Sequence, residues 1–241
     1  WNMKKGISCI IPCLNSEKYI KKNIITINKI FKKYEKKFEI ILIDDFSNDK
    51  TLEIIKSLKS SKVKIIKNKK NLGKSSSIIK GVKKSAFSKV IFVDSDLPYL
   101  KNIKQIIKGL KKYDLVFVDR GHIDSRKLNS NETFYQSLRE IIGGSIKFLI
   151  KIIFSFPYKD TQAGLKGFKK TKDFSKIKFY SRRFFLDVEL INFYHKKRKK
   201  IKNIPTSYSV AKTSTIKLFS FKNIEIILEF IKIVFLVKFK S

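Results

Sequence analysis

The architecture expected for this chain rests on one segment, Lys89-Val90-Ile91-Phe92-Val93-Asp94-Ser95-Asp96. Its run of β-branched and aromatic residues is long enough for a buried strand and too short for a helix. Because side chains alternate faces along an extended strand, Asp94 and Asp96 project the same way. Two crowded carboxylates repel each other unless a cation lies between them, and hard oxygen ligands favour Mg²⁺ or Mn²⁺. The competing interpretation is a surface turn with two solvated acids.

Similar apolar runs recur on both sides of this segment and alternate with helical patterns. We expect strands at 7–11, 39–43, 63–66, 89–93 and 115–118, and helices at 16–34, 50–58, 75–85 and 103–110. Strands that alternate with helices at this spacing predict βαβ units and a largely parallel sheet. The sequence therefore indicates the α/β class, with a Rossmann-like sheet flanked by helices.

Three of the expected strands end in polar residues, at 12–15, 44–45 and 94–96. In a parallel sheet these ends share one edge, where ligands bind in open α/β folds. Local structure is the alternative: Asn15 fits a helix cap, and Asp44, Asp45 and Asp49 fit turns or caps. Three polar ends at one edge favour a common binding crevice.

The charge balance needs an explanation, because 55 basic residues against 20 acidic ones give a net charge of +35 in 241 residues. The basic residues are mostly lysines spread from end to end, which indicates compositional bias on solvated faces. An anionic membrane surface is the second explanation and nucleic acid the third. No motif combines aromatic and basic residues as RNA-binding modules do, so we expect no nucleic-acid partner. Cys9 and Cys13 are expected to be buried free thiols, and zinc is not expected.

The second half of the sequence is less regular. The stretch 133–156 is mostly apolar but contains Arg139 and Lys147, and the stretch 224–239 contains Glu225 and Glu229. Both fall short of the roughly 18 uncharged residues of a spanning helix. We expect amphipathic helices in the membrane interface, with lysines facing anionic headgroups. Two helices packed on the sheet are the alternative.

Six segments in a fixed order carry a resemblance to a known family. They are Ile11-Pro12-Cys13-Leu14-Asn15-Ser16-Glu17, Asp44-Asp45-Phe46-Ser47-Asn48-Asp49-Lys50-Thr51, Asn71-Leu72-Gly73-Lys74, Asp94-Ser95-Asp96-Leu97, Asp160-Thr161-Gln162-Ala163-Gly164-Leu165-Lys166 and Phe185-Leu186-Asp187-Val188-Glu189-Leu190. From Ile7 to about Tyr208 the chain resembles the family 2 glycosyltransferases of the GT-A fold. Within them it resembles the polyprenyl-phosphate sugar transferases, and the dolichyl-phosphate glucosyltransferase branch more than the mannosyltransferase branch.

The resemblance implies a role for particular residues. The nucleotide-sugar would contact Pro12, Leu14, Asn15, Glu17, Asp44, Asp45, Lys74, Asp94, Ser95 and Asp96. Asp94 and Asp96 would hold Mg²⁺ or Mn²⁺. The acceptor and the sugar would contact Arg120, Arg139, Gln162, Asp187 and Glu189, and the catalytic set would be Asp96, Asp160, Arg120 and Arg139. This chain departs from the family pattern at Leu14, where tyrosine is usual, and at Phe46, where glycine is usual.

The implied reaction is inverting transfer of a sugar, glucose or mannose, from UDP-glucose or GDP-mannose to a polyprenyl phosphate. The implied location is the cytoplasmic face of a membrane, with peripheral or monotopic attachment. The implied domain is 3–212, with a nucleotide-sugar half at 3–118, an acceptor half at 119–212 and a membrane-associating tail at 213–241.

Several alternatives stay open. Asp160 is either a general base or a group that orients the acceptor, because a phosphate nucleophile is already mostly ionised at neutral pH. A family 2 transferase acting on another glycan acceptor is the rival enzyme. A non-catalytic basic module that binds membrane or nucleic acid is the rival from another class. A degenerate transferase that binds donor without turnover is the third.

Overall fold

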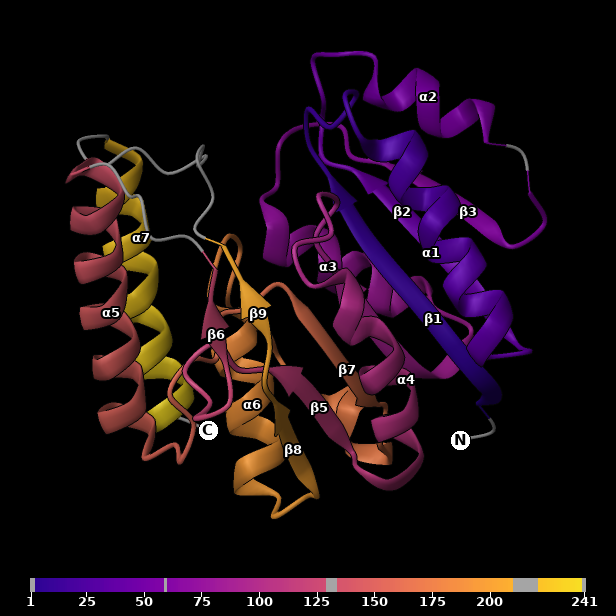
Figure 1. Cartoon of the computed structure of the whole chain (residues 1–241). Coiled ribbons are helices and arrows are strands. Elements are labelled where there is room, and N and C mark those ends of the chain that lie inside the picture. Colours follow the sequence, from indigo (N-terminus) through magenta and orange to yellow (C-terminus); the bar gives the residue numbers. More distant parts are fainter. Residues whose placement is uncertain (1–2, 59, 129–133, 210–220, 240–241) are drawn as a thin grey trace.

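The computed structural model describes residues 3–58, 60–128, 134–209 and 221–239. A seven-stranded sheet in the order β3-β2-β1-β4-β7-β5-β8 lies at its centre (Figure 1). Its strands are β1 Lys4–Cys13, β2 Phe38–Asp44, β3 Val63–Lys67, β4 Phe87–Val93, β5 Leu115–Val118, β7 Leu165–Lys169 and β8 Ile201–Ile204. The five strands expected from the sequence are all present. The strand β8 was not predicted.

Most neighbouring strands run parallel, as the alternation of strands and helices predicts. The pairs β1–β2, β1–β4, β2–β3 and β5–β8 are parallel. The strand β7 lies between β4 and β5 and is antiparallel to both. The sheet is therefore mixed but mostly parallel, and the carboxyl ends of β2, β1 and β4 lie next to one another.

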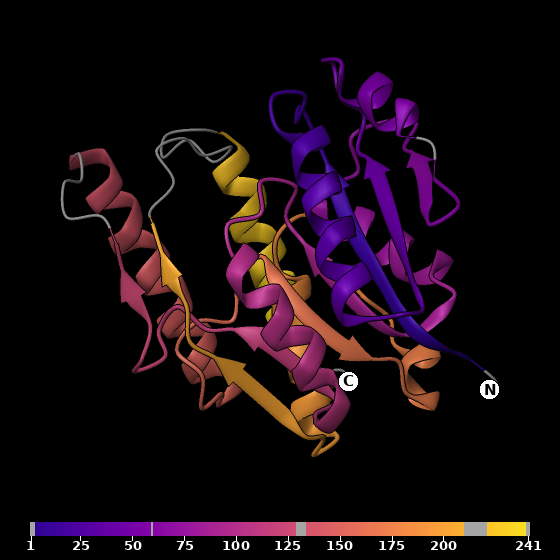
Figure 2. The same ribbon diagram turned by 45° about the vertical axis from the view of Figure 1, so that its right-hand side comes forward.

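Helices cover both faces of the sheet, as Figure 2 shows. On one face lie α1 Ile20–Tyr34, α2 Thr51–Ser57 and α4 Ile103–Lys112, and on the other α3 Lys74–Lys84 and α6 Leu186–Lys196. Strand β1 shows how one segment serves both faces: Cys9 and Ile11 enter the first hydrophobic cluster and Ile10 enters the second. This alternation follows from the period of two along a strand, and it separates two cores.

The helices α5 Phe134–Phe154 and α7 Phe221–Ile233 lie on the side of the molecule seen at the left of Figure 1. A π-helical turn, η3 Val234–Phe239, follows α7. Ile150 and Phe154 of α5 and Ile233 of α7 are buried in the same cluster as the residues of α3 and α6. The two apolar stretches therefore pack on the body of the protein through one face each. In the described residues no helix combines the length and apolar character needed to cross a membrane.

The remaining elements are short. They are the two-stranded sheet of β6 Arg126–Lys127 and β9 Ser207–Tyr208, and the 3₁₀ turns η1 Leu100–Asn102 and η2 Lys172–Lys176. Cys9 and Cys13 are buried and free, as expected. Burial raises the pKa of both thiols, which makes them poor nucleophiles.

The helix cap expected at Asn15 is wrong. Helix α1 begins at Ile20 rather than Ser16, and its N-cap residue is Tyr19. Asn15 adopts a left-handed backbone with φ of 49°, and its Oδ1 accepts a hydrogen bond from the Asn48 amide at 2.9 Å. The side chain is used by a loop 33 residues away, which local sequence could not reveal. The turn expected at Asp49 is confirmed, because its Oδ1 accepts from the Thr51 amide at 2.9 Å.

Candidate active site

A cavity of about 350 Å³ opens at the edge where β1, β2 and β4 end. Its lining comprises the strand-end residues Pro12, Cys13, Leu14, Asp45, Asp94, Ser95 and Asp96, together with Tyr19, Asn71, Gly73, Lys74, Arg183, Phe184 and Ile226. The expected meeting of three polar strand ends is therefore observed. Seven of the ten residues expected at the nucleotide-sugar line this cavity, and Asn15, Glu17 and Asp44 do not.

The acidic pair at the end of β4 is held from two sides. Lys74 Nζ lies 2.6 Å from Asp94 Oδ1. On the other side, the Asp94 amide donates to the Gly164 carbonyl at 3.1 Å, and a Cβ on Gly164 would lie 2.0 Å from Asp94 Oδ2. Asp96 is exposed at the cavity. Desolvation of its carboxyl group and the charge of Asp94 raise the pKa of Asp96.

The acidic pair is a suitable site for a divalent cation. Among the described residues, no group of three or more His, Cys, Asp or Glu side chains could hold a metal. Mg²⁺, however, is commonly held by one or two carboxylates while substrate phosphates and water complete its shell. Asp94 and Asp96 supply two hard oxygen donors whose repulsion a cation would relieve. The two carboxylates therefore fit a cation whose remaining ligands come from a diphosphate and water.

Asp45 shapes the cavity wall through three hydrogen bonds that it accepts. Its Oδ1 accepts from the Leu72 amide at 2.9 Å and from Asn68 Nδ2 at 2.7 Å, and its Oδ2 accepts from the Gly73 amide at 2.9 Å. Asp44 is fully buried, and its Oδ1 accepts from the Ser47 amide. Both carboxylates fix loops that lead to the cavity.

Glu17 does not line the cavity, and it fixes the segment before α2. Its Oε2 accepts from the Lys50 amide at 2.9 Å, while its own amide donates to Asp49 Oδ2 at 3.1 Å. Ser95, by contrast, lies at the cavity, and its hydroxyl is 3.0 Å from Ser16 Oγ. The expected nucleotide-sugar residues thus divide into cavity residues and residues that hold the loops around it.

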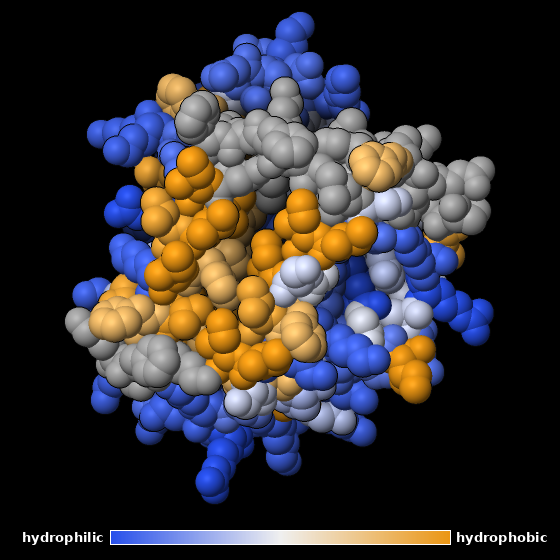
Figure 3. Space-filling view, turned by 90° about the vertical axis from the view of Figure 1, so that its left-hand side faces the viewer, coloured by the Kyte–Doolittle hydropathy of each residue, from blue (hydrophilic) through white to orange (hydrophobic). Residues whose placement is uncertain are grey.

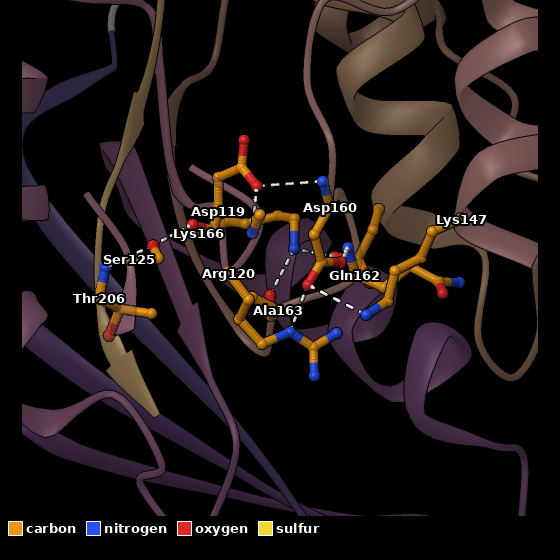
Figure 4. Close-up of polar contacts among 11 residues, drawn as sticks. Asp119, Arg120, Ser125, Lys147, Asp160, Gln162, Ala163, Lys166 and Thr206 are labelled. Carbon is orange, nitrogen blue, oxygen red and sulfur yellow. Dashed lines mark hydrogen bonds and ion pairs between the residues drawn. The ribbon is translucent and has the colours of Figure 1, made fainter. Parts of the chain in front are cut away.

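A second polar cluster follows β5 (Figure 4). Arg120 Nε donates to Asp160 Oδ2, and Lys147 Nζ of α5 lies 3.6 Å from the same oxygen. Asp119 Oδ1 accepts from the amides of Gly121 and Asp160 at 2.9 and 3.0 Å, which fixes both turns. The cluster places two cations, Arg120 and Lys147, against one oxygen of the buried Asp160 carboxylate.

The charges of this cluster set its protonation. Burial alone would raise the pKa of Asp160, but the adjacent Arg120 and Lys147 outweigh burial and hold that pKa below its ordinary value. For Lys147, burial and the charge of Arg120 outweigh Asp160 and lower the pKa. The two neighbouring cations therefore favour the ionised form of Asp160.

One loop connects this cluster to the acidic pair. Asp160 stands at its start, and Gly164 at its end packs against Asp94. Gln162 lies between them and donates its amide to Asp160 Oδ1 at 2.9 Å. Arg139 lies in α5, but its side chain is outside the part of the chain whose side chains the structure describes.

Asp187 and Glu189, expected near the sugar or acceptor, are buried at the start of α6. Asp187 Oδ1 lies 2.8 Å from Nζ of Lys166, a fully buried lysine of β7 that also donates to the Ala163 carbonyl. Burial lowers the pKa of Lys166 and raises that of Asp187. Glu189 accepts from the amides of Tyr180 and Ser181 at 2.7 and 3.0 Å, and burial raises its pKa to about 7. Both carboxylates are engaged by protein groups.

Four residues of these clusters carried no assignment from the sequence: Asp119, Lys147, Lys166 and Arg183. Lys166 lies within β7 and Asp119 directly follows β5. Their partners lie 21 and 41 residues further along the chain. Lys147 could have been noticed in the sequence, because it interrupts an apolar stretch. That interruption alone does not show that its side chain reaches Asp160.

Comparison with known proteins gives consistent results. The family model "Glycosyl transferase family 2" matches residues 8–189. The chain is 37% identical over 123 residues to the "Putative glycosyltransferase CsbB" of Bacillus subtilis. This alignment covers 49% of this chain and 37% of that protein. It is 25% identical over 232 residues to the "Dolichyl-phosphate beta-glucosyltransferase" of Dictyostelium discoideum. That alignment covers 89% of this chain and 69% of the relative. The chain thus spans about a third to two thirds of these relatives.

A solved structure shares the fold. The glucosyl-3-phosphoglycerate synthase of Mycobacterium tuberculosis, in complex with Mn²⁺, UDP and glucosyl-3-phosphoglycerate, superposes with a TM-score of 0.67. The superposition covers 96% of this chain and 79% of that chain at 15% sequence identity. The GT-A fold expected from the sequence is confirmed by this likeness.

Proposed function

This chain belongs to glycosyl transferase family 2, and we propose that it transfers a hexose, glucose or mannose, from a nucleoside-diphosphate sugar to a polyprenyl phosphate with inversion. The observation that carries the proposal is the connection between two sites. A cavity with an acidic pair adjoins, through the loop from Asp160 to Gly164, a cluster in which the cations Arg120 and Lys147 flank Asp160. Two anionic substrates could meet there. The name of the Dictyostelium relative supports a polyprenyl phosphate as acceptor.

The donor would occupy the cavity, with UDP-glucose and GDP-mannose as the candidates. Asp94 and Asp96 would hold Mg²⁺ or Mn²⁺, and the structural relative that contains Mn²⁺ and UDP supports this choice. When bound, the cation would offset the charge that develops on the leaving diphosphate. Lys74 would contribute a fixed positive charge from the other side, since its ammonium already lies against Asp94. In this proposal residues 3–118 supply most of the donor site.

The acceptor phosphate would lie at Arg120 and Lys147, with Arg139 as the further cation implied by the resemblance. Its oxygen attacks the anomeric carbon, the bond from that carbon to the diphosphate oxygen breaks, and the electron pair leaves with the nucleoside diphosphate. A phosphate monoester has a second pKa near 6, so this nucleophile needs no general base. Asp160, which is engaged by two cations and has a lowered pKa, therefore orients them. Residues 119–212 would form the acceptor half.

A lipid acceptor accounts for the apolar side of the molecule. Figure 3 shows apolar side chains gathered on the side that α5 and α7 form. These exposed residues are Ile141, Ile142, Phe148, Leu149 and Ile152 of α5 and Ile224, Ile227, Leu228 and Ile231 of α7. Apolar patches of this kind mark interfaces with membranes or proteins. We propose that this side lies on the cytoplasmic face of a membrane, with α7 as part of the tail at 213–241.

The proposal is tested by release of UDP or GDP from a panel of nucleotide sugars, with and without polyprenyl phosphate in detergent. Mg²⁺ or Mn²⁺ is present, and Asp96→Ala is the control. Lipid-dependent release with one donor, lost in Asp96→Ala, is the expected result, and it identifies the sugar. Release that ignores the lipid would favour another glycan acceptor, the rival within the family. Nucleotide binding without release from any donor would contradict the transferase proposal.

A further inference from the structure

One carboxylate oxygen of helix α7 accepts three hydrogen bonds from the segment that forms part of the cavity wall. Glu229 Oε1 accepts from Ser181 Oγ at 2.8 Å, from the Arg182 amide at 2.6 Å and from the Arg183 amide at 2.9 Å. Three donors on one oxygen of an ionised group make a strong and directional attachment. We call this set of contacts the Glu229 latch.

The segment that the latch holds is part of the cavity. Arg183 and the following Phe184 line it, and so does Ile226 of α7. The same segment supports the first turn of α3, because the Arg183 carbonyl accepts from the Ser75 amide at 3.2 Å and the Arg182 carbonyl from the Ser76 amide at 3.0 Å. That turn begins with Lys74, which pairs with Asp94. The position of α7 therefore acts on the cavity directly and through α3.

Two further carboxylates act at the same segment in different ways. Glu189 of α6 accepts from the amides of Tyr180 and Ser181, so the segment is attached to the body without α7. Glu225, one turn before Glu229, lies 3.1 Å from the side chain of Arg183, and its own side chain is 56% exposed. Glu229 thus couples α7 to the backbone of Arg182 and Arg183. Glu225 is a matched control on the same helix.

The opposite face of α7 carries exposed apolar side chains. Ile224, Ile227, Leu228 and Ile231 are between 54% and 60% exposed. A helix that packs on the protein through its inner face and carries large apolar side chains on its outer face suits the interface of a bilayer. The net charge of +35 favours anionic headgroups.

We propose that an anionic bilayer activates the donor site: by binding the outer face of α7, it holds the Glu229 latch closed and so strengthens nucleotide binding in the cavity. This inference rests on the proposed function for its choice of nucleotide and membrane as partners. Because coupling between two sites is reciprocal, nucleotide must raise the affinity for the bilayer by the same factor.

The test uses the 241-residue chain with vesicles of phosphatidylcholine and phosphatidylglycerol. Hydrogen–deuterium exchange reports on the amides of residues 180–184, and titration reports on UDP and GDP with Mn²⁺. With vesicles, exchange of the Arg182 and Arg183 amides is expected to slow, and the nucleotide that binds is expected to bind about fivefold more tightly, in the usual range of coupling. In Glu229→Ala both effects are expected to vanish, while Glu225→Ala keeps them.

Two results would overturn the inference. One is a chain that binds vesicles but shows the same exchange at 180–184 and the same nucleotide affinity as in water. The other is a chain that does not bind the vesicles at all, as would occur if another protein segment covered α7. Neither readout involves sugar transfer, so the outcome stands apart from that of the release assay. The exchange measurement on the wild-type chain needs no variant and is decisive even if Glu229→Ala fails to fold.

Discussion

Lys74 Nζ lies 2.6 Å from Asp94 Oδ1, at the wall of a cavity that also contains Asp96. The ammonium group offsets one of the two carboxylates, and Asp94 in turn holds the pKa of Lys74 above its ordinary value despite burial. The site therefore combines a carboxylate suited to a cation with a lysine suited to a phosphate. A site with both charges fits a divalent cation bound to a diphosphate better than it fits the cation alone or the diphosphate alone.

Replacing Lys74 should weaken binding of the diphosphate and spare the nucleoside. We expect Lys74→Met to reduce UDP or GDP affinity about tenfold, since a charged hydrogen bond contributes about 1.5–3 kcal/mol. Calorimetric titration of the nucleoside diphosphate and of the free nucleoside measures the difference. Lys83→Met, exposed in the last turn of the same helix, serves as the control. An equal loss for nucleoside and diphosphate would contradict this role.

Gly164 should tolerate no side chain. A Cβ there would lie 2.0 Å from Asp94 Oδ2, so Gly164→Ala must displace the carboxylate or the loop that carries Asp160. A misplacement of about 1 Å can reduce turnover about 100-fold, and we expect a loss of that order in the release assay. Gly143→Ala is the control, because no atom lies within 4 Å of its Cβ position in α5. It should stabilise the helix by about 0.5–1 kcal/mol. Comparable activity in both variants would refute the close contact.

The buried pair of Lys166 and Asp187 should reveal itself in a double-mutant cycle. Removing one partner leaves an uncompensated buried charge, so Lys166→Met or Asp187→Leu alone should cost about 3–5 kcal/mol. The double variant should cost less than the sum, because no buried charge remains. Urea unfolding of the four proteins measures the cycle. If the costs add, the two side chains do not depend on each other.

Glu189 should make the stability of the protein depend on pH. Burial raises its pKa in the folded protein from 4.5 to about 7, so the folded chain binds its proton more readily than the unfolded chain between these values. The free energy of unfolding contributed by this group therefore falls as pH rises from about 4.5 to 7 and is constant above. Glu189→Gln lacks this contribution. We expect the stability difference between wild type and variant, measured by urea unfolding, to shift against the wild type between pH 5 and pH 8.

The parts of the fold that were predicted are those with local signals. The runs before Asp45 and Asp94 are apolar and β-branched, and they became buried parallel strands whose ends share an edge. The direction of β7 was not predictable, because nothing in this five-residue strand indicates which strands lie beside it. The charge of the buried Lys166 is paired with Asp187, which lies 21 residues further along the chain in a helix.

The candidate site shows the same division. The resemblance pointed to Asp94, Asp96 and Lys74, which belong to short sequence motifs and line the cavity. It could not show that Glu189 is occupied by backbone amides, nor that Glu229 reaches the cavity wall from α7. These contacts join segments that the chain brings together only after folding, and no short-range pattern encodes them.

Lys147 should belong to the acceptor site rather than to the donor site. Its ammonium lies 3.6 Å from Asp160 Oδ2, beside Arg120, and its lowered pKa reflects burial and a neighbouring cation. A phosphate dianion between Lys147 and Arg120 would relieve that repulsion. Lys147→Met should therefore raise KM for polyprenyl phosphate about tenfold and leave KM for the nucleotide sugar unchanged. Lys151→Met, exposed one turn further along α5, should change neither. A rise in KM for the donor instead would move Lys147 out of the acceptor site and leave Arg120 to bind the phosphate without it.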